Sequence, residues 1–132
     1  MRKTILIAIC VLALFACKKE VPQGDVVYCV TGDYTNVTEH SVTINCSSVT
    51  DKFLNVGERG VWLSTNPDVT QDNCGWYESH DAYSTEKYTV KIESLQAGTT
   101  YYYRSYVRIK HEFSRSSYYS GEVKFFTTLP EV

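Results

Sequence analysis

The stretch Leu95–Tyr101, which reads Leu-Gln-Ala-Gly-Thr-Thr-Tyr, joins two segments that have the residue pattern of β-strands. Upstream, Lys87–Leu95 alternates polar and apolar residues, and downstream Thr99–Lys110 is the longest predicted strand. Alternation with a period of two indicates strands that bury one face. Gly98 allows the connection a backbone conformation that is closed to most residues. We therefore expect a tight turn between two strands of an all-β protein.

The chain from Val26 onward keeps this pattern. Apolar or β-branched runs alternate with clusters of Gly, Asn, Asp and Ser, which is typical of strands and turns. No window after the N-terminal segment shows a convincing 3.6-residue period. The further predicted strands are Val26–Thr31, Ser41–Ser47, Arg59–Ser64 and Glu122–Thr128. Their spacing favours a two-sheet sandwich over alternating strands and helices.

Four segments resemble, in chain order, the fibronectin type III domains found in surface lipoproteins of the Bacteroidetes. Gly60–Pro67 resembles their third strand and the turn after it, and Leu95–Tyr101 resembles the corner between strands E and F. Tyr101–Tyr106 is similar to their Tyr-Tyr-x-Arg-Ala-Tyr strand, and Phe125–Thr128 to their closing Phe-x-Thr strand. Together these similarities cover most of residues 25–130.

This resemblance implies an immunoglobulin-like sandwich of about seven strands over residues 26–132. It also makes Tyr101 a corner tyrosine, whose ring packs inside while its hydroxyl bonds the backbone upstream. It implies little about activity, because such domains serve as spacers, adhesion modules and partner-binding modules.

The N-terminus has the features of an export signal. Arg2 and Lys3 precede Ile5–Phe15, a charge-free apolar run of 11 residues that is too short to span a bilayer. Leu14–Cys17 resembles a bacterial lipobox, in which the Cys becomes acylated after cleavage before it. We expect a lipoprotein signal peptide over residues 1–16, a lipidated Cys17 and a flexible tether over 17–25. These features predict a lipid-anchored protein at the outer membrane or cell surface.

The chain of 132 residues has the length of a single domain. Its formal net charge is −2, and removal of Arg2 and Lys3 with the signal leaves 11 basic against 15 acidic side chains, a net charge of −4. Nucleic-acid binding needs a clustered Lys and Arg excess, so the charge argues against that class of partner. We expect no cofactor.

Three of the five cysteines remain after Cys10 and Cys17 are set aside. Cys29 and Cys46 lie on predicted neighbouring strands and are the candidates for a disulfide, although buried free thiols are an equal alternative. Cys74 is then unpaired. The cysteines have no C-x-x-C spacing and the three His are scattered, so no metal site is predicted.

Motifs that would indicate an enzyme are missing from the sequence. It contains no Gly-x-Ser-x-Gly, His-Glu-x-x-His or phosphate-binding glycine loop. Ser79-His80-Asp81 holds three triad residue types, but neighbours in sequence do not have the geometry of a triad. A pair of Cys74 and His80 has the same weakness. We therefore predict no catalytic residue.

Strand parity suggests a binding face. If Tyr101 points inward, so do Tyr103, Ser105, Val107 and Ile109, and the residues between them point outward. If Val61 and Leu63 point inward, Trp62 between them points outward. Aromatic and Arg side chains are enriched at protein interfaces, and exposed rings also suit stacking on sugars. The alternative is ordinary sheet surface. The predicted face consists of Trp62, Tyr102, Arg104, Tyr106 and Arg108.

Two long connections are further candidates. Asp68–Lys87 contains the candidate binding residues Trp76, Tyr77 and Tyr83. Equally, an aromatic of this stretch could cap the core while part of the stretch forms a short edge strand. Lys110–Gly121 is predicted as a hairpin or loop before the last strand, a position of binding loops in antibody domains.

The sequence as a whole favours a non-catalytic surface lipoprotein that binds or spaces a protein partner. The alternative is a carbohydrate-binding accessory lipoprotein that uses exposed aromatic side chains.

Overall fold

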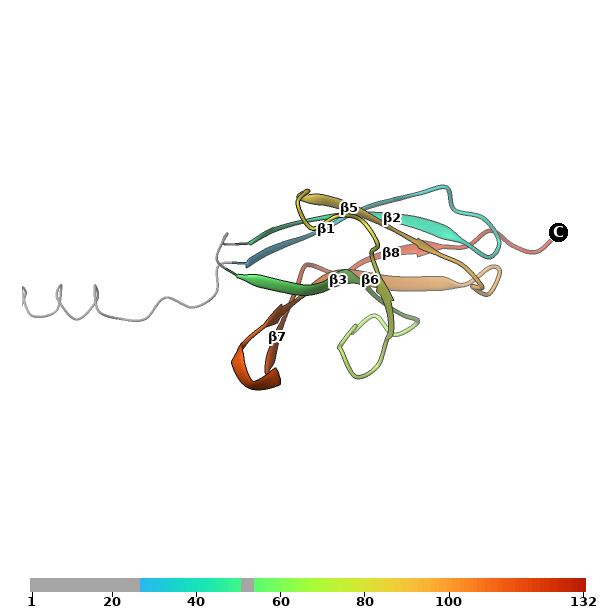
Figure 1. The fold of residues 1–132 in the computed structure, drawn as a ribbon. Coiled ribbons are helices and arrows are strands. Elements are labelled where there is room, and N and C mark those ends of the chain that lie inside the picture. Colours follow the sequence, from blue (N-terminus) through green and yellow to red (C-terminus); the bar gives the residue numbers. More distant parts are fainter. Residues whose placement is uncertain (1–26, 51–53) are drawn as a thin grey trace, which may run out of the picture.

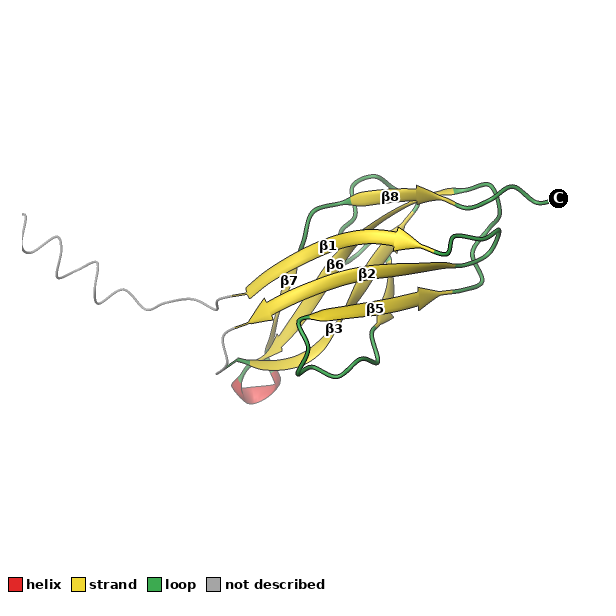
Figure 2. Cartoon of the chain, turned by 90° about the horizontal axis from the view of Figure 1, so that it is seen from above, coloured by secondary structure: helices red, strands yellow, loops and turns green. Residues whose placement is uncertain are grey.

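Two antiparallel sheets face each other in the computed structural model, which describes residues 27–50 and 54–132 (Figures 1 and 2). The first sheet has the order β1-β2-β5, with β1 at Val27–Thr35, β2 at Val42–Thr50 and β5 at Lys87–Ile92. The second has the order β4-β3-β6-β7, with β8 also paired to β6. Its strands are β4 Gly75–Glu78, β3 Asn55–Ser64, β6 Thr100–Lys110, β7 Ser116–Ser120 and β8 Lys124–Thr127. The fold is an immunoglobulin-like β-sandwich, as predicted.

The predicted signal peptide, Cys17 and the predicted tether lie outside the described residues. All six predicted strands are present, with boundaries shifted by a few residues. Two short strands were not predicted as such. β4 lies inside the Asp68–Lys87 connection, which fits the edge-strand alternative, and β7 lies inside Lys110–Gly121 after the 3-10 turn η1, Glu112–Ser114. Both are short and carry few β-branched residues, so their pattern is weak.

The main core lies between the sheets. Alternate residues of β2, β5 and β6 point into it, so the burial of β5 reads exposed, buried, exposed, buried along Lys87–Ile92. The buried cluster joins side chains from both sheets: Val42, Ile44, Cys46, Val61, Leu63, Tyr88, Val90, Ile92, Leu95, Tyr101, Tyr103 and Phe126. Burial of these side chains is the main driving force for closing one sheet on the other.

The turn before β6 has the geometry that the sequence predicts. Gly98 has a φ of 58°, in the left-handed region where a Cβ is strained. Its backbone N–H donates to the Leu129 carbonyl at 2.9 Å, which ties the turn to the C-terminal segment. The Tyr101 ring is buried, and its hydroxyl accepts the Gln96 N–H at 2.9 Å. Tyr101 therefore has the contacts that the resemblance implies for a corner tyrosine.

The candidate disulfide is absent, because Cys29 and Cys46 are free thiols. They lie on paired strands, but the register places Cys29 opposite Ser48 and Cys46 opposite Thr31. The two cysteines are therefore diagonal neighbours, a wider separation than that of residues directly opposite. Burial, together with the neighbouring Cys46, raises the pKa of Cys29 to about 11, and burial also raises that of Cys46.

Candidate functional site

A second group of packed side chains lies on the outer face of the β4-β3-β6-β7 sheet. We call Trp62, Tyr106, Trp76 and Tyr118 the outer aromatic cluster. The rings of Trp62 and Tyr106 stack with centroids 5.3 Å apart and an interplanar angle of 11°. Trp76 and Tyr118 meet edge to face, with centroids 5.3 Å apart at 88°. Such offset-stacked and edge-to-face pairs are the arrangements that aromatic rings prefer.

Strand register brings these four rings together. Trp76 of β4 is directly opposite Trp62 of β3, and Tyr118 of β7 is opposite Arg108 of β6. Tyr106 is opposite Gly60, where a Cβ would come within 2.0 Å of the Tyr77 carbonyl oxygen, so only glycine fits between the strands. The sequence expectation that Trp62 and Tyr106 leave the inner face of the sheet is therefore confirmed.

The expectation that these two side chains are exposed is wrong. Trp62 is 4% exposed and Tyr106 0%, because Val69 folds over them from the β3–β4 connection. That connection is held by Asn73, whose Nδ2 donates to the Asp68 carbonyl and whose Oδ1 accepts the Thr70 N–H. The centre of the predicted binding face is thus a second core, which a ligand cannot reach without displacing the connection.

The polar members of the predicted face make internal contacts. Arg104 donates to the carbonyls of Gly121 at 2.8 Å and Val69 at 3.0 Å. The second bond helps to fix the β3–β4 connection over Trp62 and Tyr106. Arg108 lies 3.8 Å from a Glu58 carboxylate oxygen, and the Tyr106 hydroxyl donates to the other oxygen of Glu58. Burial, then the neighbouring Glu58, raises the pKa of Tyr106. Arg104, Arg108 and the half-buried Tyr102 remain partly accessible at the edge of this second core.

Trp76 and Tyr118 are the members of the outer aromatic cluster that reach solvent, and we call this pair the rim. Trp76 is 39% and Tyr118 is 38% exposed, and the Trp76 Nε1–H donates to the Gln71 carbonyl at 3.1 Å. The other candidate loop residues have different roles. Tyr77 packs against the main core, and the exposed Tyr83 donates its hydroxyl to the Gly57 carbonyl at 3.2 Å. Among the predicted loop residues, Trp76 is therefore the one in the cluster.

A groove of about 390 Å³ runs beside Trp76 where the two sheets part, between β4 and β5. Both strands are sheet edges, and polar side chains surround the opening. The groove is lined by Trp76, Tyr77, Glu78, His80, Asp81, Thr89, Val90 and Lys91. An aromatic ring beside charged groups is suited to binding an extended, polar ligand.

The candidate enzyme residues near this groove are used structurally. The Ser79 hydroxyl donates to the Thr89 carbonyl at 3.0 Å, and an Asp81 carboxylate oxygen accepts the Thr89 N–H at 2.7 Å. These bonds attach the β4–β5 connection to the outer edge of β5. Cys74 packs against the outer aromatic cluster, and burial raises its pKa, whereas a reactive thiol needs a lowered one.

Sequence reasoning missed Arg59, whose guanidinium makes several hydrogen bonds to the β4–β5 connection. It is buried, and its guanidinium donates to the carbonyls of Thr85 at 2.6 Å and Ala82 at 2.7 Å. The same group lies 4.6 Å from the centroid of the Tyr88 ring, a cation–π contact. Arg59, Val61 and Leu63 are alternate residues of β3 and so face the same side of the sheet. An Arg in this inward-facing series was the sequence signal that could have identified it.

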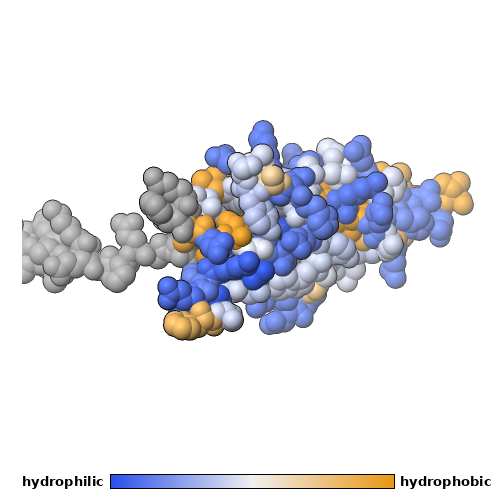
Figure 3. Space-filling model, viewed as in Figure 1, coloured by the Kyte–Doolittle hydropathy of each residue, from blue (hydrophilic) through white to orange (hydrophobic). Residues whose placement is uncertain are grey.

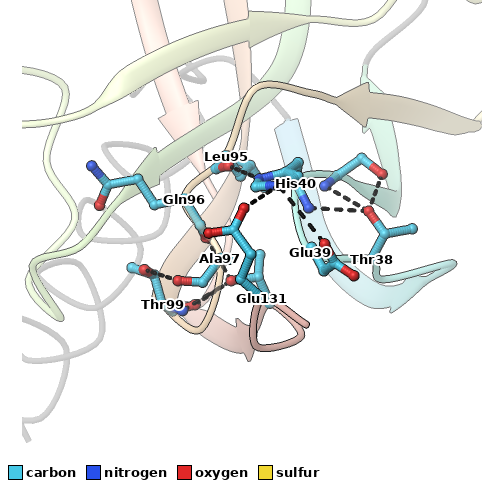
Figure 4. A network of polar contacts seen from close by, with 10 residues as sticks. Thr38, Glu39, His40, Leu95, Gln96, Ala97, Thr99 and Glu131 are labelled. Carbon is cyan, nitrogen blue, oxygen red and sulfur yellow. Dashed lines mark hydrogen bonds and ion pairs between the residues drawn. The ribbon is translucent and has the colours of Figure 1, made fainter.

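His40 was also expected to be isolated, but the fold brings it beside the C-terminal segment (Figure 4). Its Nδ1 lies 2.8 Å from the Leu95 carbonyl, and its Nε2 lies 3.9 Å from Glu39 and 3.5 Å from Glu131. Within the part of the chain that the structure describes, this is the one group of three possible metal ligands with mutual separations under 4.8 Å. All three are solvent-accessible ion-pair partners, and they fasten the C-terminal segment to the β1–β2 turn.

Comparison with known proteins extends the description of the fold. No protein-family model matches the chain, and no curated protein matches it. A solved structure that it resembles is the sensor domain of the anti-sigma factor RsgI4 in Pseudobacteroides cellulosolvens, with a TM-score of 0.50 and 16% sequence identity. The match covers 80% of this chain and 96% of that one. At this identity the likeness concerns the fold alone, and it supports the two-sheet sandwich described above.

Proposed function

We propose that this protein is a non-catalytic surface lipoprotein whose immunoglobulin-like domain binds a protein partner through the rim of the outer aromatic cluster. The observation that carries the proposal is the exposed pair of Trp76 and Tyr118, which stands on the buried pair of Trp62 and Tyr106. Trp and Tyr are the side chains most often found at the energetic centre of protein interfaces.

The rim is held in place before any partner arrives. The Trp76 indole is fixed by its bond to the Gln71 carbonyl and by ring contacts to Trp62 and Tyr106, with centroids 5.3 Å and 5.2 Å away. A side chain that is already ordered loses little conformational entropy on binding, so more of its contact energy appears as affinity. The adjoining groove adds charged groups at its border, including Glu78 and Lys91.

The test is partner capture from intact cells with the lipidated full-length protein. Chemical cross-linking followed by mass spectrometry should identify a defined partner with the wild type. The double variant Trp76→Ala with Tyr118→Ala should lose that partner, whereas Phe125→Ala, which removes a 63% exposed ring on β8, should retain it. Retention by the rim variant, with the fold intact by circular dichroism, would overturn the proposal.

A glycan ligand is the second candidate, and the groove favours it. Trp76 borders this groove together with Glu78, Asp81 and Lys91, so a ring for stacking lies beside hydrogen-bonding groups for hydroxyls. Glycan-array binding that is lost in Trp76→Ala and in Lys91→Ala would favour this candidate. Capture of a protein partner that is insensitive to added sugars would favour the first.

The membrane anchor is part of the proposal and rests on the N-terminal sequence. Among the described residues, no helix is long and apolar enough to cross a membrane. Acyl chains on Cys17 would hold the domain at the outer membrane or cell surface. Cys17→Ser should abolish incorporation of labelled palmitate and leave unprocessed precursor, and continued labelling of that variant would contradict the assignment.

A further inference from the structure

One end of the sandwich gathers the start of the domain and an exposed aromatic turn. Strand pairing places Val27 beside Thr50, and it places Lys110 beside both Asn55 and Ser116. The β6–β7 turn, which includes η1, therefore lies at the end of the sandwich where the chain enters β1 (Figures 1 and 2). Figure 3 shows hydrophobic surface at the tip of this turn.

Phe113 lies in this turn and is 87% exposed. Its φ is 60° and that of Ser114 is 62°, so two consecutive residues other than glycine adopt the left-handed conformation. That conformation is costly for a bulky side chain and persists where the surrounding structure imposes it. Here the His111 N–H donates to the Arg115 carbonyl at 2.8 Å, which closes the turn and holds the ring in solvent.

Two exposed apolar side chains lie at the same end of the sandwich, on the other sheet. Tyr28 of β1 is opposite Val49 of β2, and both are exposed on the outer face. Apolar side chains thus stand on both sides of the end from which the chain continues toward Cys17. Residues 18–26 separate Cys17 from Val27, and the ten residue steps between these two span at most about 36 Å.

Charge differs between the two ends of the domain. Lys110 and Arg115 are exposed on either side of Phe113, with Glu112 the acidic residue between them. The opposite end carries Glu39 and Glu131, which lie with His40 beside the β1–β2 turn. The β6–β7 turn thus carries two exposed basic side chains against one acidic side chain, and an anionic lipid surface attracts this local excess.

We propose that the β6–β7 turn docks on an anionic phospholipid surface, with Phe113 in the headgroup boundary and Lys110 and Arg115 beside lipid phosphates. This inference extends the proposed Cys17 anchor, which would keep the turn close to the bilayer and strengthen a contact that the turn also makes by itself. Aromatic rings favour the interface between water and acyl chains, and basic side chains bind the anionic headgroups. Docking would orient the outer aromatic cluster relative to the membrane, so that its rim is presented in one direction.

The test replaces Phe113 with the photoreactive analogue p-benzoylphenylalanine in the full-length lipidated protein. The protein is reconstituted in vesicles of phosphatidylethanolamine and phosphatidylglycerol and illuminated, and lipid adducts are measured by mass spectrometry. The matched control carries the analogue at Phe125, an exposed phenylalanine of β8 at the part of β6 remote from the turn. We expect lipid adducts at position 113 and few at position 125.

Charge variants test the electrostatic part of the inference. The double change Lys110→Gln with Arg115→Gln should lower the adduct yield at position 113 by up to about 30-fold, since each basic residue near an anionic surface contributes about fivefold to binding. Replacing the anionic vesicles by neutral phosphatidylcholine vesicles should lower the adduct yield at position 113 of the protein with Lys110 and Arg115 unchanged to a similar extent. Equal yields at positions 113 and 125 would overturn the inference.

Acylation of Cys17 is measured on the same sample, from the mass of the N-terminal peptide. Adducts at position 113 without acylation would support docking and refute the anchor. Acylation without adducts at position 113 would refute docking and leave the anchor standing. Absence of both would refute both, because a turn that inserts in lipid should cross-link in either state of Cys17.

Discussion

The backbone N–H of Gln96 donates a 2.9 Å hydrogen bond to the hydroxyl oxygen of Tyr101, five residues further along the chain. The bond closes the turn before β6 while the Tyr101 ring stacks on Phe126, with centroids 5.6 Å apart. Tyr101→Phe keeps the ring and removes the acceptor, so we expect the free energy of unfolding to fall by about 1–2 kcal/mol. Urea denaturation measures this. Tyr102→Phe, on the opposite face of β6, should change it by less than about 0.5 kcal/mol, and an equal loss in both variants would contradict the role of this hydrogen bond.

Trp62 and Trp76 face each other across β3 and β4 but should respond differently to truncation. Trp62→Ala opens a cavity in the second core and should cost about 3–5 kcal/mol of unfolding free energy. Trp76→Ala removes a 39% exposed ring and should cost about 1–2 kcal/mol, with its main effect on binding. Thermal and urea unfolding of both variants checks the difference. Similar stability losses would contradict the distinction between a buried Trp62 and a Trp76 at the rim.

Arg59 should be required for stability because of the hydrogen bonds that its guanidinium makes. Its guanidinium donates to the Ala82 and Thr85 carbonyls and to the buried Ser48 hydroxyl, so removal takes a donor from three acceptors at once. Arg59→Met preserves much of the volume and should still cost about 2–4 kcal/mol.

Hydrogen exchange locates that loss in the molecule. In Arg59→Met, faster exchange should be concentrated in residues 79–86, because these carbonyls belong to the connection before β5. Arg108→Met, at a half-buried position of the interior strand β6 of the same sheet, is the matched control and should leave exchange in residues 79–86 unchanged. Unaltered exchange there in Arg59→Met would contradict the assignment.

Alkaline pH should destabilise the fold. Burial raises the pKa of Cys29 from 9.0 to about 11, and it raises the pKa values of Tyr88, Tyr103 and Tyr106 above their ordinary value of 10.0. The folded state therefore retains protons that the unfolded state releases, and the free energy of unfolding falls as pH rises. The contribution of Cys29 is fully present below about pH 9 and is lost between pH 9 and 11.

Urea denaturation at a series of pH values measures this dependence. Cys29→Ala should flatten the part between pH 9 and 11, and the loss attributable to tyrosines should remain above pH 10. Tyrosinate absorbance should show a group of tyrosines that ionises together with unfolding. Stability that does not change across this range would contradict the burial of these groups.

The three described cysteines should differ in their reaction with a water-soluble maleimide. Burial raises the pKa values of all three, but Cys74 lies at the edge of the outer aromatic cluster, whereas Cys29 and Cys46 lie deeper, inside the sandwich. The thiolate is the reactive form, so Cys74 should react first and the other two after unfolding. Peptide mass spectrometry identifies the labelled sites. A Cys29–Cys46 cross-link in protein from non-reducing conditions would contradict the free thiols of the structure.

The sequence was sufficient for the sandwich because the signals that define it are local. Alternation in Lys87–Leu95 and Thr99–Lys110 identified strands and the residues that face the core, and Gly98 identified the turn between them. A period of two also placed Trp62 and Tyr106 on the outer face, since neighbouring residues of a strand must point to opposite sides. β4 and β7 were anticipated only as alternatives, an edge strand in one connection and a hairpin in the other, because each is held mainly by pairing with a longer strand.

Exposure was decided by the tertiary structure. A strand pattern reports which side of a sheet a residue faces, but it cannot report whether another segment covers that side. Val69 reaches Trp62 and Tyr106 through a connection whose path depends on distant partners such as Arg104. The same reason applies to Cys29 and Cys46, where the register between β1 and β2 separates two residues that the sequence places on neighbouring strands. The sequence therefore determined the layers and the side that each residue faces, whereas only the tertiary structure determined which outer residues reach solvent, because covering a face requires contacts between segments far apart in the chain.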